Sequence, residues 1–456
     1  MLGEAVRRFP HTLVAGLVVF ALQCVHGSAQ AFLYDAVQYW GAPMALLTGG
    51  GVSDVGVLQI RGVLSVFVYL APALVTTILG PASAVWTVLA WNALLASVIC
   101  VVLVPRVAAL VSPGRTVARI WLSAVIGGAM LSGFARYPHL DVWSAAFALT
   151  GVYCLAAGRR WWTIALGGAA LAVAANLRPS YIAPLAITAV VLLVARPRQV
   201  VWALPGIVAG VLPQVIFNLV KFGSWNAGPV ATPFLLQVQA QQAAFTIRYD
   251  TVAFVDRHPQ QWFCDPAYAA LLVDDAPPTS PSGVMGSALA HLPDSLWFLS
   301  QKAATALHWS LATPYEYSPS SGTSVMTLLV VAVSAVGLVA LVWRLITVWS
   351  ERPQRVAALA LLGFWFGALA TLVLSTPETR FALPLALVGL IGLLTVLPLR
   401  LEGARARRSS AIALGVAVIL VAALFVAGKA GLSHPQPPGA LTDAAMCAAM
   451  SEDAAD

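Results

Sequence analysis

Residues 323–343 read Thr323-Ser-Val-Met-Thr-Leu-Leu-Val-Val-Ala-Val-Ser-Ala-Val-Gly-Leu-Val-Ala-Leu-Val-Trp343 and contain no charged side chain. About 20 apolar residues in an α-helix are enough to cross the hydrocarbon core of a bilayer. Because that core offers no water, the backbone polar groups must bond within the segment, as they do in a helix. The stretch therefore predicts a transmembrane helix.

Runs of this kind recur along most of the 456-residue chain. Only 9% of the residues are charged and 60% are hydrophobic, whereas an ordinary soluble domain carries about 25% charged residues. These proportions predict an all-α fold, a polytopic transmembrane helical bundle with about 11 to 12 spans. The runs that we take as spans lie at residues 11–33, 62–79, 84–104, 118–135, 140–157, 161–176, 179–195, 200–220, 323–343, 356–375, 380–398 and 410–428.

The arginines that give the chain a formal net charge of +7 lie in short clusters between the apolar runs. Such clusters mark the cytoplasmic face of a membrane protein, and they do not follow one face as a nucleic-acid site would. We therefore expect the lipid bilayer and no nucleic acid as a partner, and a multi-pass position in the cytoplasmic membrane. The clusters contain Arg106, Arg115, Arg119, Arg159, Arg160, Arg196, Arg198, Arg344, Arg352, Arg355, Arg400, Arg405, Arg407 and Arg408.

The first apolar run lies between Arg7-Arg8 and a small-residue stretch at 27–31, a pattern similar to a signal peptide. Because many spans follow, we expect an uncleaved first helix. With Arg7-Arg8 inside, the segment 34–61 lies outside, but counting back from Arg106 through two full spans places it inside. Either one run between residues 62 and 135 is not a complete crossing, or one arginine cluster departs from the rule.

The only long segment without a span is the loop from residue 221 to 322, where helical apolar spacing predicts interfacial helices at 233–245 and 289–308. Its acidic bias fits an extracytoplasmic face. The Pro/Ala-rich tail is expected to be disordered. The chain thus divides into an N-terminal membrane module (1–220) with a first outer loop (34–61), a large extracytoplasmic loop (221–322), C-terminal transmembrane helices (323–430) and a tail (431–456).

The five cysteines form no CxxC pair and show no metal-ligand spacing, so we predict no metal site from them. Cys264 and Cys447 are the two that lie outside apolar runs. On the outer side of a membrane they can form a disulfide, and they can equally remain free thiols.

Asp35 lies just past the first apolar run, within Ala31-Phe-Leu-Tyr-Asp-Ala-Val-Gln-Tyr-Trp40. A carboxylate at the rim of a membrane bundle is unfavourable unless it is solvated or paired, which makes Asp35 a candidate functional residue, with Tyr39 beside it. The alternative is that Asp35 only ends a helix in water. Asp141, two residues after His139 at the start of a later span, is a second candidate.

Several cations fall on or near the same outer face, and an arginine fork is suited to bind phosphate oxygens at two points. The alternative for each is a charge that extends to water at the interface. Glu378 is expected either at the site or in a local ion pair with its neighbour Arg380. The candidate substrate-binding residues are Tyr39, Arg61, Arg136, His139, Arg178, Lys221, Glu378 and Arg380.

The order of these features resembles the GT-C superfamily of membrane glycosyltransferases over residues 1 to 400. Each motif is short, and their order and shared membrane face carry the resemblance. The motifs are Asp35 with Tyr39-Trp40, Leu46-Leu-Thr-Gly-Gly50, Tyr137-Pro-His-Leu-Asp141, Gly167-Gly-Ala-Ala-Leu-Ala-Val-Ala-Ala-Asn-Leu-Arg178-Pro179, Asn218-Leu-Val-Lys221-Phe222-Gly223 and Pro377-Glu378-Thr-Arg380-Phe381-Ala-Leu-Pro384.

The resemblance implies an inverting enzyme of the dolichyl- or polyprenyl-phosphate mannosyltransferase and aminoarabinose transferase type. It implies a polyprenyl-phosphate sugar as donor, no other cofactor, and a site at the outer membrane surface; a divalent metal stays open. Asp35 would match the catalytic base and Asp141 a second acidic position. Ala36 stands where many relatives have another acid, which argues against the protein O-mannosyltransferase subtype and leaves the acceptor open.

Sugar transfer from a polyprenyl phosphate needs a base for the acceptor hydroxyl and cations for the departing phosphate. One carboxylate and several arginines meet both needs, so we predict a glycosyltransferase whose acceptor is a cell-wall glycan, a glycolipid or a protein. The Ala/Val/Leu/Arg-rich composition suggests a GC-rich bacterial source.

The alternative function is a transporter or flippase of a lipid-linked or small solute, although the two parts of the chain do not mirror each other as transporter repeats often do. A non-catalytic scaffold would give no reason for the converging charges.

Overall fold

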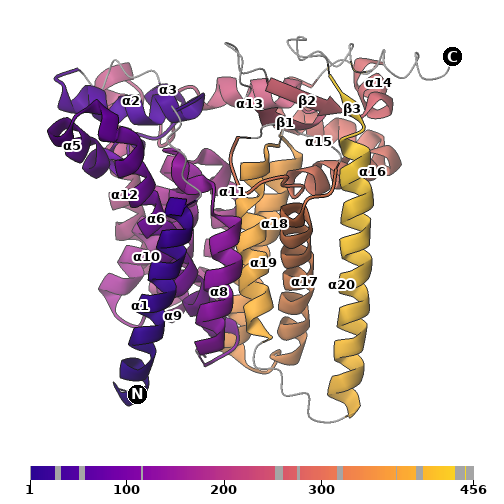
Figure 1. Cartoon of the computed structure of the whole chain (residues 1–456). Helices are drawn as coiled ribbons and strands as arrows, with labels where there is room; N and C mark the ends of the chain where they lie inside the picture. The colour runs from indigo at the N-terminus through magenta and orange to yellow at the C-terminus, as the bar shows by residue number, and fades with distance from the viewer. Residues whose placement is uncertain are drawn as a thin grey trace. The chain divides into compact units, whose positions relative to one another are not determined.

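The computed structural model describes residues 2–25, 32–50, 57–114, 117–251, 260–274, 278–315, 322–375, 377–396, 404–436 and 447. The described chain is almost entirely helical, which confirms the predicted fold class (Figure 1). Its elements are α1 (Leu2–Val25), α2 (Asp35–Leu47), α3 (Val57–Ile60), α4 (Ser65–Val68), α5 (Leu70–Leu79), α6 (Ala84–Val98), α7 (Val104–Val111), α8 (Val117–Met130), α9 (Leu140–Ala157), α10 (Trp161–Leu177), α11 (Ile182–Ala195), α12 (Val200–Phe222), α13 (Thr232–Gln241), β1 (Phe245–Asp250), β2 (Gln260–Cys264), α14 (Pro266–Asp274), α15 (Pro281–Ala290), α16 (Leu292–Ala306), α17 (Val325–Thr347), α18 (Arg352–Val373), α19 (Leu383–Thr395), α20 (Ala404–Gly431) and β3 (His434–Pro435).

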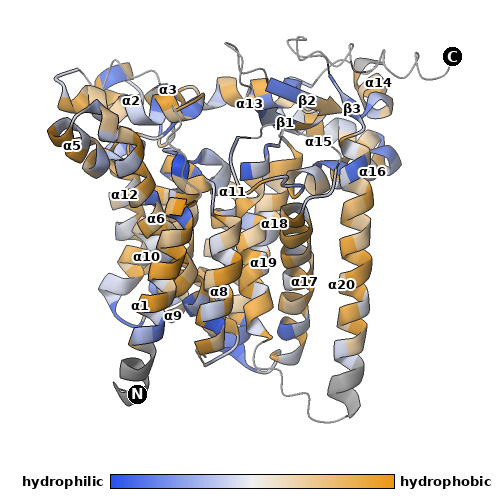
Figure 2. Ribbon diagram, in the orientation of Figure 1, coloured by the Kyte–Doolittle hydropathy of each residue, from blue (hydrophilic) through white to orange (hydrophobic). Residues whose placement is uncertain are grey.

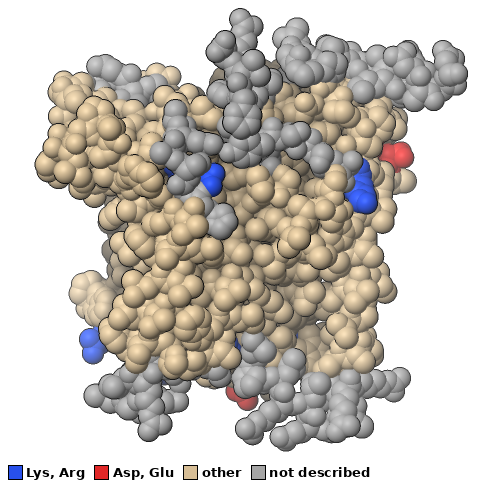
Figure 3. Space-filling view, viewed as in Figure 1, with Lys and Arg blue, Asp and Glu red and all other residues tan. Residues whose placement is uncertain are grey.

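Many of these helices have the length and surface of membrane spans. Along α12 and α20, only 22% and 17% of the most apolar window is buried, so most of those side chains face outward. Such a surface suits lipid and is unfavourable in water. Figure 2 shows that the long helices are mostly hydrophobic, and the face drawn in Figure 3 carries few charged residues. The chain is therefore a polytopic membrane protein. Six described segments are long and apolar enough to cross a membrane: Pro81–Val111, Leu140–Ala157, Pro197–Phe222, Val325–Thr347, Arg352–Val373 and Ser409–Gly431.

The apolar run at 62–79 is not one continuous helix. It is divided into α4 and α5, and the ten residues of α5 extend about 15 Å, half of a hydrocarbon core of about 30 Å. An incomplete crossing at 62–79 is the first of the two alternatives given above, and it would place the segment 34–61 outside. The small-residue stretch 27–31, Arg115 and Arg400 lie outside the described residues.

Close contacts divide the chain into two units, each of which we describe by itself. The boundaries fall inside α17, α18 and α19, so the units do not follow the division by sequence position. Unit 1 consists of Met1–Thr232, Gly337–Gly367 and Leu387–Arg407, and unit 2 consists of Pro233–Val336, Ala368–Ala386 and Arg408–Asp456.

In unit 1, α10 packs closely between α9 and α12. The approach of α10 to α12 depends on glycine, since a Cβ at Gly206 would lie 1.8 Å from the carbonyl oxygen of Ala165. A Cβ at Gly168 would likewise lie 2.3 Å from the carbonyl oxygen of Ala203. Small residues allow this backbone contact in membrane helices, and the contact holds the first half of α10 against α12.

Unit 2 contains a small antiparallel sheet in the order β1-β2-β3, which we did not predict. Helices form in both stretches where we expected them, as α13 and α16, but Phe245 begins a strand. In β1, the apolar residues Phe245, Ile247 and Tyr249 alternate with polar ones. This period of two was a strand signal in the sequence.

The start of the C-terminal tail, for which we expected disorder, supplies β3, which pairs with β2. Gln436 follows β3 and its backbone N–H donates to the carbonyl of Trp262 at 2.8 Å. Cys264 and Cys447 form a disulfide across 183 positions of sequence. Of the two alternatives for these cysteines, the structure therefore has the bonded pair. The other tail residues, 437–446 and 448–456, lie outside the described chain.

Lys302 on α16 is fully buried in unit 2. Its Nζ donates to the carbonyl oxygen of Ala243 at 2.9 Å and lies 5.2 Å from the ring centroid of Phe298. Removal from water disfavours the charged amine and lowers the pKa of Lys302 to about 7.

We expect this lysine to make stability depend on pH. An unfolded lysine has a pKa of about 10.4, so between about pH 7 and pH 10 the unfolded state binds more protons and the free energy of unfolding rises with pH, by up to about 1.4 kcal/mol per unit. Lys302→Met should flatten this rise when denaturation in detergent is measured at pH 7 and pH 9. Lys429→Met, at an exposed lysine of the same unit, should retain it. Equal slopes for Lys302→Met and the wild type would contradict the assignment.

Candidate active site

Asp35 is the first residue of α2, and its side chain is 28% exposed. A guanidinium nitrogen of Arg61, Nη2, lies 3.8 Å from Asp35 Oδ2. The preceding residue, Tyr34, has φ 46° and ψ −128°, a conformation that costs a non-glycine residue on the order of 1–3 kcal/mol and that recurs at functional sites. Asp35 is thus an accessible carboxylate that a strained turn presents to solvent.

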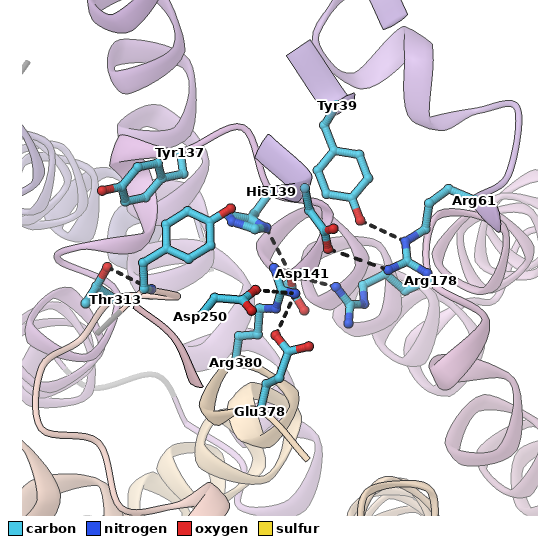
Figure 4. Close-up of polar contacts among 12 residues, drawn as sticks. Tyr39, Arg61, Tyr137, His139, Asp141, Arg178, Asp250, Thr313, Glu378 and Arg380 are labelled. Carbon is cyan, nitrogen blue, oxygen red and sulfur yellow. Dashed lines mark hydrogen bonds and ion pairs between the residues drawn. The ribbon is translucent and has the colours of Figure 1, made fainter. Parts of the chain in front are cut away.

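Arg61 is held from a second side by Tyr39, on the same helix as Asp35. Its Nε donates to Tyr39 Oη at 2.7 Å (Figure 4). Because Asp35 and Tyr39 lie one turn apart on α2, one guanidinium contacts both. The structure therefore adds Arg61, a candidate from a separate segment, to the neighbouring candidates Asp35 and Tyr39.

A second ion pair joins α9 to the end of α10. Arg178 Nη1 lies 2.8 Å from Asp141 Oδ2, and both side chains are buried (Figure 4). His139 Nδ1 lies 3.7 Å from the same oxygen. His139 precedes α9 in an extended conformation, which lets it share a side with Asp141 despite the spacing of two residues.

The two pairs are connected by an aromatic contact within unit 1. The rings of Tyr39 and His139 meet edge to face, with centroids 6.0 Å apart. One end of this unit thus carries an accessible ion pair, a buried ion pair and the two rings between them.

Buried polar groups fix the segment that leads into α9. Asn92 on α6 donates through Nδ2 to the carbonyls of Ala135 and Tyr137, at 3.2 and 2.9 Å. Tyr69 donates through its hydroxyl to the carbonyl of His139 at 2.7 Å. These bonds hold the backbone on which His139 and Asp141 are presented.

A row of amides fixes the backbone next to Arg61. Gln214 Oε1 accepts hydrogen bonds from the backbone of Val63 and from Asn176 Nδ2, at 2.7 and 3.0 Å. The backbone N–H of Gly62 donates to the carbonyl of Asn176 at 3.0 Å, and Asn218 extends the row by accepting from Gln214. Since Arg61 directly precedes Gly62, the amide row on α10 and α12 determines where Arg61 lies.

Gly62→Ala is expected to displace this segment. A Cβ at Gly62 would lie 2.0 Å from Asn176 Oδ1 and 2.2 Å from its carbonyl oxygen, and such overpacking typically costs about 1–3 kcal/mol. Denaturation in detergent should show that loss. Gly41→Ala on α2 is the matched control, because a Cβ there meets nothing within 4 Å. A variant at Gly62 as stable as the control would contradict the packing argument.

Two of the expected cations have no carboxylate partner in the described chain. Arg136 is half-buried, and its Nε is buried without a hydrogen-bond partner. Lys221 is exposed in the last turn of α12. Among the described residues, neither forms a hydrogen bond or ion pair with the members of the two ion pairs, and both keep their charge available to an anion.

In unit 2, Glu378 and Arg380 form the local ion pair that was one of our expectations, with 2.5 Å between Oε2 and Nη2 (Figure 4). Arg380 is 1% exposed and also lies 3.7 Å from Asp250 Oδ2 on β1. Arg248 forms an ion pair with Glu378 and approaches Asp250. The charges of Glu378 and Arg380 are thus balanced within a group of four, of which Asp250, Glu378 and Arg380 are buried and Arg248 is partly exposed.

Asn92, Gln214, Tyr69 and Gly62 are not among the residues predicted from the sequence, and no role was predicted for Asp250. The signal for the amides was present in the sequence, because a lone amide within an apolar run is unfavourable in lipid unless it bonds inside the bundle.

Among the described residues, no group of three or more His, Cys, Asp or Glu side chains could hold a metal ion. No family model, no curated protein and no solved structure matches the chain.

Proposed function

We propose that this protein is a membrane glycosyltransferase that moves a sugar from a polyprenyl-phosphate donor to an extracytoplasmic acceptor. One observation carries the proposal: the accessible carboxylate of Asp35 lies 3.8 Å from Arg61, which also donates to Tyr39, at the end of a membrane unit beside the pair Asp141–Arg178. A base and cations at the rim of a membrane bundle are what this transfer requires.

In the proposed reaction, Asp35 accepts the proton of the acceptor hydroxyl. The acceptor oxygen bonds to the anomeric carbon of the sugar as the bond from that carbon to the phosphate oxygen breaks. Polyprenyl phosphate leaves with the bonding electrons, and the anomeric configuration inverts. Arg136 and Lys221, which have no carboxylate partner in the described chain, stabilise the phosphate, while Arg61 orients the base.

The disulfide supports an extracytoplasmic site in the cytoplasmic membrane. Disulfides persist in oxidising compartments, and Cys264 is bonded to Cys447. The segment that contains Cys264 follows α12 in the chain. Asn218, near the end of α12, belongs with Asn176 and Gln214 to the amide row that lies next to Arg61. The chain therefore leaves unit 1 from the end that carries Asp35.

A transfer assay tests the proposal. Purified protein is incubated with a panel of radiolabelled polyprenyl-phosphate sugars and a membrane extract that supplies glycan, glycolipid and protein acceptors. We expect label to pass from one donor to an extract component. Uptake of labelled solute into vesicles containing the protein, without covalent transfer, would favour the transporter alternative and overturn the proposal.

A further inference from the structure

A cavity of about 260 Å³ lies between α11 and α18, at the end of unit 1 away from the Asp141–Arg178 pair. Helix α11 begins four residues after Arg178 and ends at Ala195, so its last turn reaches the far end of the unit. The cavity is lined by Ala195, Arg196, Arg352, Pro353 and Val356.

Two guanidinium groups share this cavity without a counter-charge. Arg352 Nη2 donates to the carbonyl oxygen of Ala195 at 3.1 Å, and no side-chain bond to Arg196 is found among the described residues. Glu351 is exposed and forms no ion pair with either arginine in that part of the chain. Two like charges so placed repel each other, and an anion between them would remove that repulsion.

Exposed tryptophans indicate the level in the bilayer at which this end of unit 1 lies. Trp161 opens α10, and its ring centroid lies 6.1 Å from that of Trp202 near the start of α12. Trp349, three residues before α18, is 57% exposed and lies under the guanidinium of Arg355 at 5.1 Å. Tryptophan gathers at the headgroup level of a bilayer, so the cavity between α11 and α18 opens at that level.

We propose that this cavity binds the phosphate group of an anionic phospholipid. The two arginine forks supply donors for the phosphate oxygens, and the first turn of the long helix α18 adds the positive end of its dipole. Val190 and Val194 on α11, which are 61% and 75% exposed, give the acyl chains an apolar path from the cavity. This path selects a lipid over a free phosphate ion, and basic pockets between membrane helices commonly hold such headgroups.

The test compares phosphatidylglycerol with phosphatidylcholine of the same acyl chains and with inorganic phosphate. Full-length protein in neutral detergent is titrated with each, and bound lipid is counted by native mass spectrometry while the thermal midpoint is followed. We expect phosphatidylglycerol to bind and to raise the midpoint. In the double variant Arg196→Gln/Arg352→Gln, its affinity should fall about 10- to 30-fold.

The variant Arg159→Gln/Arg160→Gln is the matched control, because it removes two exposed charges from the same end of unit 1 without touching the cavity. We expect it to bind phosphatidylglycerol as the wild type does. Arg196→Lys/Arg352→Lys keeps the charge but loses the forks, and should bind with intermediate affinity. Equal losses in the control and cavity variants, an equal midpoint shift with inorganic phosphate, or equal binding of phosphatidylcholine would each overturn the proposal.

Discussion

Asp35→Asn is expected to reduce sugar transfer about 10²- to 10⁴-fold, the contribution of a positioned general base. The amide keeps the size of the side chain but cannot accept the acceptor's proton. Because Asp35 is partly exposed and its contact with Arg61 is 3.8 Å long, we expect the thermal midpoint to change little. The loss should therefore appear in kcat, measured with the donor identified in the transfer assay.

Two further variants make this prediction specific. Asp294→Asn replaces an exposed carboxylate that also lies in the first turn of a helix, α16, and should transfer sugar at the wild-type rate. Asp35→Glu retains a base and should recover part of the activity. If Asp35→Asn transfers sugar normally, Asp35 is not the base, even if the protein remains a glycosyltransferase.

Arg178→Met is expected to lower the free energy of unfolding by about 3–5 kcal/mol, because it leaves a buried charge without its partner. Asp141 would keep His139 Nδ1, at 3.7 Å, as its nearest ion-pair partner. Chemical denaturation in detergent measures this loss, and the transfer assay should show reduced activity as well.

The double variant Asp141→Leu/Arg178→Met separates stability from function. Replacing both members of a buried ion pair with apolar side chains is often neutral or stabilising, so this variant should recover much of the lost stability. We expect it to remain inactive, since the charges beside His139 and Tyr39 are gone. Equal instability of the single and double variants would show that the unpaired charge is not the cause.

Apolar runs in the sequence predicted where helices lie, but they did not predict where helices break. The runs at 140–157 and 161–176 correspond closely to α9 and α10. The run at 62–79 is equally apolar, yet it divides at Tyr69, whose hydroxyl bonds to the carbonyl of His139, 70 residues away. Hydropathy measures how well a segment dissolves in lipid, and it does not register Pro72, which lacks the N–H that would bond to the carbonyl of Val68 and so favours a break there.

The sheet of unit 2 shows a similar limit. The alternation in β1 is readable in sequence, but β3 comes from a short stretch, His434–Pro435, that has no strand pattern of its own. Its pairing with β2 lies next to the disulfide between Cys264 and Cys447. The spacing of the two cysteines could not decide between a bond and two free thiols, because bonding depends on the distance between their backbones.

By itself, the sequence determined that the chain is a helical membrane protein and that Asp35, Asp141 and several cations fall near span ends, because hydrophobicity and charge fix which segments enter lipid. Which charge pairs with which depends on the folded arrangement of the helices. The tertiary structure assigned Arg61 to Asp35, Arg178 to Asp141 and Arg380 to the pair of Glu378 and Asp250. An ion pair between distant segments depends on how helices pack, and that packing rests on contacts such as Gly206 against Ala165, which no local pattern records.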